Sequence, residues 1–212
     1  MSDVQLTIDG MPVTVPEGTT VFDAARMHGI PIPTLCHQQN ETPVGVCRVC
    51  VVDVNARVFA ASCVRPAENK MVVTTNSDRV RKARRTLVEL LMADHPSPCA
   101  RERQSGDCEL ETLARLEGIA HPRYPRRLSP RGQDNSSLVI AVDHEACILC
   151  DRCIRGCDEI RHNDVLGRRG KGFMAGIAFD YNLPMGKIPC IHRRRRMMSC
   201  PWAGCNRTRC RP

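Results

Sequence analysis

Aromatic residues are scarce in this sequence of 212 residues, since Phe, Tyr and Trp together make up 3% of it. A large hydrophobic core that is stable by itself is therefore not expected, and bound cofactors are expected to add stability. No basic segment followed by an apolar one stands at the N-terminus, and no run approaches the roughly 18 apolar residues of a membrane span. We predict neither secretion nor a membrane span, and expect a reducing, cytoplasmic location.

Several sequence motifs of enzymes are also missing. We find no GxGxxG fingerprint, no P-loop and no nucleophile motif, so nicotinamide chemistry is expected in a partner rather than in this chain. Acidic residues are missing after Asp180, which places the whole net charge of +8 in the C-terminal tail. The run Arg193 to Arg196 can bind phosphates, but Trp202 is the sole aromatic interleaved with it. A solvated tail is therefore the simpler interpretation, and no nucleic acid is expected.

The apolar pattern predicts an α+β chain. Alternating Val and Leu residues flank Asp9-Gly10, which is typical of a β-hairpin, and Thr19 or Thr20 can cap a helix that ends near Met27. Helical spacing predicts two further helices, over 76–93 and 108–117. Pro and Arg residues indicate a linker at 121–135, and glycines predict turns over 167–176. Short strands are expected at 51–54, 58–61, 72–74 and 138–142.

Cysteine is abundant, with 14 residues, many of them in CxxC arrays that suit metal ligation better than disulfides. The first group is Cys36-x10-Cys47-x2-Cys50-x12-Cys63. Four thiolates at such spacing can hold a [2Fe-2S] cluster, with two on each iron. A structural zinc site is the competing interpretation, because zinc also takes four cysteines. The hairpin and helix that precede the group match a β-grasp domain and favour the cluster.

The second group is His95-x3-Cys99-x8-Cys108, which follows the helix predicted over 76–93. Imidazole and thiolate both bind iron, and three ligands are present for a four-iron cluster. A single histidine near a helix end is, however, more often a cap or a surface residue. The sequence leaves both interpretations open.

The third group is Cys147-x2-Cys150-x2-Cys153-x3-Cys157, the run of bacterial ferredoxins. In two-cluster ferredoxins three cysteines of one run share a cluster with the fourth cysteine of the other run. The second run is altered here, because Arg193 and Arg196 stand between Cys190 and Cys200, and arginine cannot ligate iron. One [4Fe-4S] cluster, on Cys147, Cys150, Cys153 and Cys200, is complete. Cys157 and Cys190 remain as the remnant of a further one.

In their order and spacing, these motifs resemble an N-terminal iron-sulfur region found in three kinds of protein. These are the large peripheral-arm subunit of respiratory complex I (NADH-quinone oxidoreductase), the NAD-dependent formate dehydrogenase alpha subunit and the iron-only hydrogenases. The resemblance covers essentially the whole chain. It implies a β-grasp [2Fe-2S] ferredoxin-like domain at 1–75, a helical His-Cys segment at 76–120, a linker at 121–137 and a partly degenerate two-cluster ferredoxin-like domain at 138–212. It also implies that His95 is a [4Fe-4S] ligand with Cys99 and Cys108.

Three departures from this family pattern stand out. Glu102 occupies the place of the second cysteine in the His-Cys motif, and a carboxylate is a harder, weaker ligand for such iron. Arg193 and Arg196 remove two ligands of the last cluster. Finally, the family proteins continue into a large catalytic region, whereas this sequence stops at Pro212.

The resemblance therefore implies an electron-transfer module that relays single electrons from a flavin- or NADH-oxidising subunit to a molybdopterin or other catalytic subunit. Its expected cofactors are one [2Fe-2S] cluster, one [4Fe-4S] cluster and a second [4Fe-4S] cluster at His95 if Glu102 is tolerated. Assembly in a peripheral membrane complex is compatible with the absence of a membrane span. The alternatives are a truncated fragment that couples to nothing and a zinc protein that binds nucleic acid through its arginine tail.

Overall fold

The computed structural model describes residues 2–127, 129–138 and 140–187, and the chain divides into two compact units. The first unit comprises Met1–His37 and Thr42–Val88, and the second comprises Gln38–Glu41 and Glu89–Pro212. Cys190 and Cys200, Arg193 and Arg196 lie outside the described residues. No helix among the described residues has both the length and the apolar composition to cross a bilayer.

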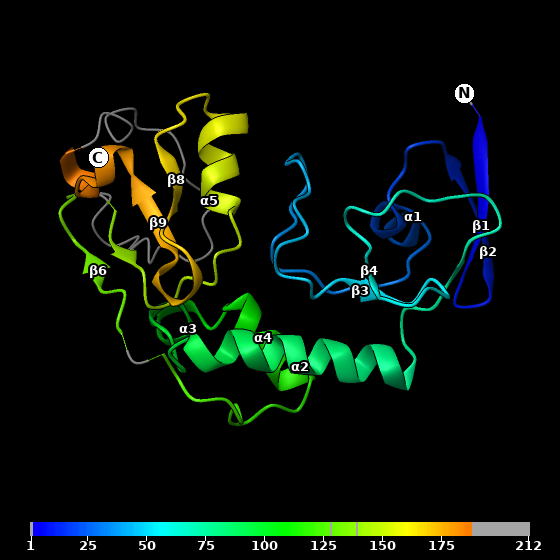
Figure 1. The fold of residues 1–212 in the computed structure, drawn as a ribbon, viewed down its shortest axis with the longest axis horizontal. Helices are drawn as coiled ribbons and strands as arrows, with labels where there is room; N and C mark the ends of the chain where they lie inside the picture. Colours follow the sequence, from blue (N-terminus) through cyan, green and yellow to red (C-terminus); the bar gives the residue numbers. More distant parts are fainter. Residues whose placement is uncertain (1, 128, 139, 188–212) are drawn as a thin grey trace. The chain divides into compact units, whose positions relative to one another are not determined.

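The first unit is built on the predicted hairpin. Strands β1 (Asp3–Ile8) and β2 (Met11–Pro16) pair antiparallel, and β1 also pairs parallel with β5 (Val72–Val73) (Figure 1). Asp9 and Gly10 have φ values of 50° and 83°, as a tight hairpin turn requires. The Asp9 carboxylate accepts a hydrogen bond from Thr75 N at 2.7 Å and fastens this turn to the end of β5.

Helix α1 (Val21–Met27) packs against this sheet through an apolar face. It begins at Thr20, whose side-chain oxygen accepts a hydrogen bond from Asp23 N at 3.0 Å, so the predicted cap is confirmed. Alternate residues of the hairpin meet one face of the helix because strand side chains repeat every second residue. The resulting core contains Val4, Leu6, Ile8, Val13, Val15, Val21, Ala24 and Ala25. Burial of each of the larger ones contributes about 1.5–3 kcal/mol.

The remaining strands of the first unit are shorter than the sequence suggests. Strands β3 (Val51–Val52) and β4 (Ala60–Ala61) form an antiparallel pair of two residues each. The long helix α2 (Asp78–Asp94) begins in the first unit and ends in the second. Its existence is confirmed, with the ends displaced by one or two residues from the prediction.

In the second unit two short helices follow α2. Helix α4 (Glu109–Leu116) was predicted, whereas α3 (Ala100–Ser105) was not, because its sequence ARERQS has no apolar face. Cys99 caps α3 through its sulfur, which accepts a hydrogen bond from Glu102 N at 3.3 Å. Gly106 ends α3 in the left-handed region, with φ of 65°.

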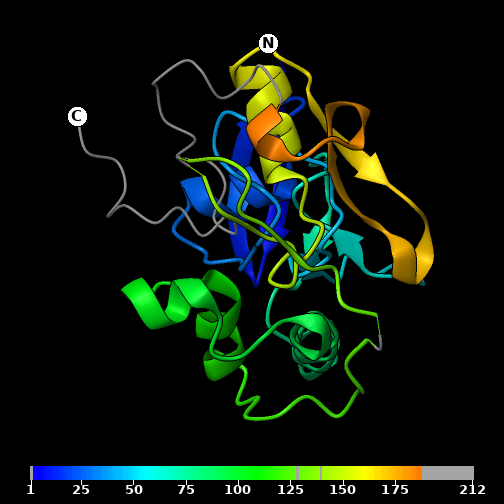
Figure 2. The ribbon, with the colours of Figure 1, turned by 90° about the vertical axis from the view of Figure 1, so that its left-hand side faces the viewer.

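The C-terminal part of the described chain holds two small hairpins. Strand β6 (Gln133–Asp134) lies inside the segment predicted as a linker and pairs with β7 (Val142–Asp143). Strands β8 (Leu166–Arg169) and β9 (Gly176–Phe179) form an antiparallel hairpin (Figure 2). The turns predicted within 167–176 lie between these strands, at Gly170 and at Gly172–Met174, whereas the two strands that they connect were not predicted.

Helix α5 (Arg152–Arg155) leads directly into a π-helical turn at Gly156–Ile160. This turn carries Cys157 into a small core with Leu166, Phe179 and Met185. Short 3₁₀ turns at Gly172–Met174, Asp180–Asn182 and Met185–Lys187 complete the described chain.

Candidate metal centres

The first group of cysteines comes together as its spacing predicts. Cys36 follows α1, Cys47 and Cys50 lie in the loop that enters β3, and Cys63 follows β4. Cys36, Cys50 and Cys63 are fully buried, and Cys47 is 6% exposed. The sulfurs of Cys50 and Cys63 lie 3.4 Å apart. Two loops far apart in the sequence thus bring four thiols into one buried site.

The loop around these thiols depends on unusual backbone conformations. Gly45 and Arg48 both have φ of 61°, in the left-handed region. A Cβ atom on Gly45 would lie 3.3 Å from Val64, so that the loop packs closely there. Arg48 donates a hydrogen bond to Phe59 O at 3.3 Å, and Ser62 donates one to Cys50 O at 2.8 Å. These contacts join the two loops that carry the thiols.

The crowded thiols perturb one another. Hydrogen bonds from Cys47 and then Cys63 lower the pKa of Cys36 to about 2, and a hydrogen bond from Cys63 lowers the pKa of Cys50 to about 6. Their contacts with Cys36 raise the pKa of Cys47 and of Cys63 well above the ordinary value. Thiolates are therefore favoured at two of the four positions. Thiolate is the form of cysteine that binds iron, so these residues fit a [2Fe-2S] cluster.

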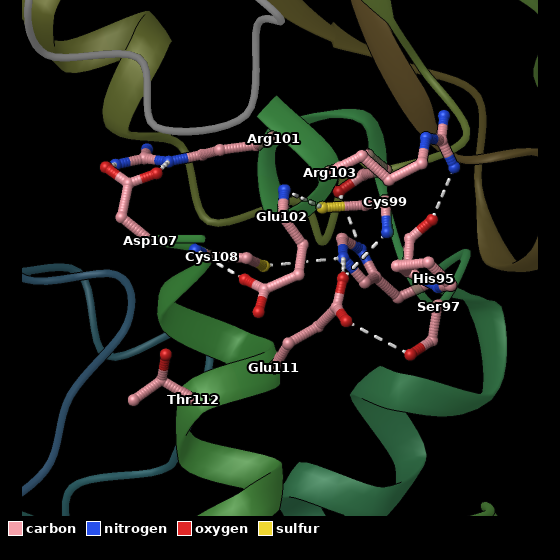
Figure 3. A network of polar contacts seen from close by, with 12 residues as sticks. His95, Ser97, Cys99, Arg101, Glu102, Arg103, Asp107, Cys108, Glu111 and Thr112 are labelled. Carbon is pink, nitrogen blue, oxygen red and sulfur yellow. Dashed lines mark hydrogen bonds and ion pairs between the residues drawn. The ribbon is translucent and has the colours of Figure 1, made fainter. Parts of the chain in front are cut away.

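The second site lies in the second unit, around His95, Cys99 and Cys108. Their ligand atoms and a carboxylate oxygen of Glu111 all lie within 4.8 Å of one another, and all four residues are buried. His95 Nε2 lies 3.6 Å from Cys108 Sγ and 3.7 Å from Glu111 Oε1. In Figure 3 the side chains of these three residues point toward one another.

Glu111 was not anticipated from the sequence. Its Oε1 accepts a hydrogen bond from Cys99 N at 2.8 Å, and its Oε2 accepts one from Ser97 Oγ at 3.1 Å. Burial acts to raise the pKa of Glu111, but the bonds from Cys99 and Ser97 bring it below the usual value. The local signal was the spacing Cys108-x2-Glu111, which places a carboxylate at the third residue of a helix that begins after a cysteine.

Glu102, the fourth ligand suggested by the sequence, has its carboxylate engaged elsewhere. One oxygen lies 2.7 Å from the Arg115 guanidinium. The other accepts a hydrogen bond from Cys108 N at 3.0 Å (Figure 3). Glu102 thus binds the backbone at the start of α4, while Glu111 of α4 binds the backbone at the start of α3. Each helix thus supplies a carboxylate that binds the first residues of the other helix. The carboxylate that lies near the sulfurs of Cys99 and Cys108 is that of Glu111.

The third site is a loop that carries Cys147, Cys150 and Cys153. Cys150 is buried, and the other two cysteines are half-buried. Leu149 and Asp151 have φ values of 57° and 60°. The Leu149 N–H group donates to Cys147 Sγ at 3.5 Å, which is the kind of contact that stabilises a thiolate.

Three arginines bind the backbone of this loop. Arg155 donates to Cys150 O at 3.3 Å, Arg168 donates to Leu149 O at 2.9 Å, and Arg131 donates to Cys147 O. The Arg168 guanidinium also pairs with Asp151, whose hydrogen bonds raise the pKa of Arg168. Cationic groups around the cysteines favour the thiolate form there.

Buried four-thiol geometry in a β-grasp-like unit, followed by His-Cys and ferredoxin-type cysteine groups, defines an iron-sulfur protein. Residues 2–78 match the family described as a 2Fe-2S iron-sulfur cluster binding domain, and residues 84–123 match the NADH-ubiquinone oxidoreductase-G iron-sulfur binding region. The chain therefore belongs to the family of iron-sulfur regions found in the large peripheral-arm subunit of complex I and in NAD(P)-linked hydrogenase subunits. The predicted cofactor types, [2Fe-2S] and [4Fe-4S], are confirmed.

Individual relatives agree with this assignment. The chain is 39% identical to the NADP-reducing hydrogenase subunit HndD of Solidesulfovibrio fructosivorans, over 95% of this chain and 35% of that protein. It is 31% identical to the mitochondrial NADH-ubiquinone oxidoreductase 78 kDa subunit of Candida albicans, over 81% of this chain and 24% of the relative. This chain thus spans about a quarter to a third of the length of these relatives.

A solved structure also resembles the fold. The chain aligns with a chain of a crystal structure of NAD⁺-reducing [NiFe]-hydrogenase in the H₂-reduced state, with a TM-score of 0.77 and 32% identity. The alignment covers 84% of this chain and 75% of the other. The α+β fold predicted from the sequence is thereby confirmed.

Proposed function

We propose that this chain relays single electrons within an NAD(P)H-linked oxidoreductase. In this role it accepts electrons from a flavin-containing, NADH-oxidising subunit and delivers them to a catalytic subunit, of molybdopterin or another type. The observation that carries the proposal is the buried set of thiols at Cys36, Cys47, Cys50 and Cys63. Relatives named as NADH- and NADP-linked oxidoreductase subunits support it.

Each cluster has its own set of residues in this proposal. The [2Fe-2S] cluster is held by Cys36, Cys47, Cys50 and Cys63, and supplies one-electron chemistry when bound. The [4Fe-4S] cluster is held by Cys147, Cys150, Cys153 and Cys200, of which Cys200 lies outside the described residues. The chain itself keeps water from the first site by burial, since three of the four thiols there are fully buried.

Positively charged side chains also surround the loop of Cys147, Cys150 and Cys153, which holds the proposed [4Fe-4S] cluster. The N–H group of Leu149 and the guanidinium groups of Arg131, Arg155 and Arg168 place positive charge beside the loop of Cys147. Positive charge and hydrogen bonds to sulfur stabilise the reduced form of a cluster and raise its potential. We propose a cytoplasmic location as well, because the reduced thiols of three such sites need a reducing compartment.

Low-temperature EPR of the anaerobically purified full chain, reduced with dithionite, tests this function. The Cys50→Ser variant removes one thiolate of the first site and is expected to abolish the [2Fe-2S] signal. The Cys99→Ser variant is the matched control, because Cys99 is equally buried but belongs to the other unit, and it is expected to keep that signal. A signal that survives in Cys50→Ser, or a colourless protein with zinc and no sulfide, would contradict the proposal.

A further inference from the structure

The His95 site has a donor set that differs from the cysteine sites. It offers one imidazole nitrogen, two sulfurs and one carboxylate oxygen, from His95, Cys99, Cys108 and Glu111. None of these four residues is more than 6% exposed. Among the residues that the structure describes, these four are the one group of at least three His, Cys, Asp or Glu side chains whose donor atoms all lie within 4.8 Å of one another.

The orientation of His95 suits a metal ligand. Its Nδ1 lies 3.2 Å from Ala146 O, and since a carbonyl accepts hydrogen bonds, Nδ1 carries the proton. Nε2, which faces Cys108 and Glu111, is then unprotonated and can act as a metal ligand. Histidines that bind metals commonly donate their other ring N–H group to a backbone carbonyl in this way. The His95 side chain is wholly buried, so the ring is held in this orientation.

The distances between the donors indicate how many metal ions they share. Four ligands on one zinc ion, at about 2.0–2.3 Å from it, lie about 3.3–3.8 Å apart. The separations of His95 Nε2 from Cys108 Sγ and Glu111 Oε1, 3.6 and 3.7 Å, fall in this range. The ligands of a [4Fe-4S] cluster each bind a different corner of a cube, and so lie farther apart. These four donors therefore fit one ion and do not fit a cube.

The departures of the sequence agree with this geometry. Glu102 replaces the cysteine that the family motif has there, and its carboxylate is bound by Arg115 and by Cys108 N. One ligand that a [4Fe-4S] cluster needs is therefore absent. Glu111 supplies a fourth donor atom next to those of His95, Cys99 and Cys108. Two thiolates with an imidazole and a carboxylate form a donor set that zinc accepts.

We propose that His95, Cys99, Cys108 and Glu111 bind a single Zn²⁺ ion in place of an iron-sulfur cluster. With four protein ligands the ion is closed to substrate, and it holds α3 and α4 to the end of α2. Because Zn²⁺ has no redox chemistry, this site lies outside the electron path. The inference stands on residues other than those that carry the proposed relay, so either one can fail alone.

Metal analysis of the full chain and two variants tests the site. The wild-type chain, purified from medium with both iron and zinc, is expected to hold one zinc ion. In competition with a chromophoric chelator, Glu111→Gln is expected to bind zinc at least about tenfold more weakly than the wild type. Glutamine can still accept the hydrogen bond from Cys99 N, so the fold is expected to persist. Glu102→Gln is the matched control and is expected to keep zinc affinity within about twofold. An unchanged EPR signal from the [4Fe-4S] cluster proposed at Cys147, Cys150 and Cys153, which lie in the same unit as Glu102 and Glu111, reports that each variant folds.

Cobalt provides a second measurement. Co²⁺ in this site is expected to give intense tetrahedral d–d bands and thiolate charge-transfer absorption, which Cys108→Ser lowers by about half because two thiolates contribute. Two outcomes overturn the proposal. One is four extra irons with matching sulfide that are lost in Glu111→Gln. The other is a zinc ion that is lost in Glu102→Gln and retained in Glu111→Gln.

Discussion

At the scale of single residues, Arg84 supports the first cluster site from within the protein. It is 7% exposed and donates hydrogen bonds to Val49 O at 3.4 Å, Val51 O at 3.5 Å and Thr75 O at 3.1 Å. Val49 and Val51 flank Cys50 in the sequence. The guanidinium therefore holds the backbone on both sides of one cysteine in place.

We predict that Arg84→Leu lowers the free energy of unfolding of the first unit by about 3 kcal/mol, because it leaves buried carbonyls without donors. The same variant is expected to lower [2Fe-2S] occupancy. Urea denaturation followed by visible absorption of the cluster measures both. Arg84→Lys keeps the charge but has fewer directed donors. Its free energy of unfolding is expected to lie between those of the wild type and Arg84→Leu. A midpoint equal to that of the wild type in Arg84→Leu would refute this role.

His144 gives the second unit a dependence on pH. Burial, followed by the charge of Arg169, lowers the pKa of this imidazole from 6.5, and Arg131 acts in the same direction, while Asp134 and Asp143 oppose it. The unfolded chain therefore binds the His144 proton at a higher pH than the folded chain does. Between those two pKa values the unfolded state holds more protons, so stability falls as pH decreases through about 6.5.

We predict that the denaturation midpoint of the second unit decreases as the pH is lowered from 7.5 to 5.5. In His144→Gln this decrease is expected to be smaller. The difference between variant and wild type isolates the imidazole from other groups that titrate in the same range. Equal pH dependence in the two proteins would show that His144 does not contribute.

The cysteines and their spacing in the sequence indicated the candidate cysteine sites, but nothing in the sequence led us to Glu111. Cys36, Cys47, Cys50 and Cys63 can be recognised because spacing is a property of the sequence. The position of Glu111 depends on the approach of α4 to residue 99, which is a tertiary contact. The same reason explains why Glu102, nearer in the motif, appeared to be the ligand.

At the scale of elements, local signals account for what was predicted correctly. Asp9 and Gly10 allow a tight turn, and Thr20 caps α1, so that the hairpin and the first helix could be identified from short segments. Helix α3 has no apolar period and is held by Cys99 and Gly106 at its ends. The β8–β9 hairpin was missed because glycine is read as a turn signal before pairing partners are known.

The cap of α1 offers a direct test at this scale. Thr20→Ala removes the oxygen that binds Asp23 N, and is expected to cost about 1 kcal/mol of the stability of the first unit. Thr20→Ser keeps the oxygen and is expected to stay close to the wild type. Chemical denaturation compares the three proteins. Equal losses in both variants would point to the lost methyl group rather than to the cap.

At the scale of the whole molecule, the two units carry different kinds of site. The first holds four thiols, two of which, those of Cys50 and Cys63, lie in the core that also contains the β1–β2 hairpin. The second combines the His95 site with the arginine-lined loop of Cys147. Family membership and the cysteine motifs agree on both cluster types, and the His95 site is one place where this chain departs from the family pattern, because Glu102 replaces a cysteine there.

The most direct test of the account is analysis of iron, acid-labile sulfide and zinc in the anaerobically purified chain, together with EPR after reduction. We predict about six irons and six sulfides, two in the [2Fe-2S] and four in the [4Fe-4S] cluster, with two distinct EPR signals. One zinc is expected beside them. Zinc without sulfide, and no EPR signal after reduction, would contradict the central claim that this chain carries electrons.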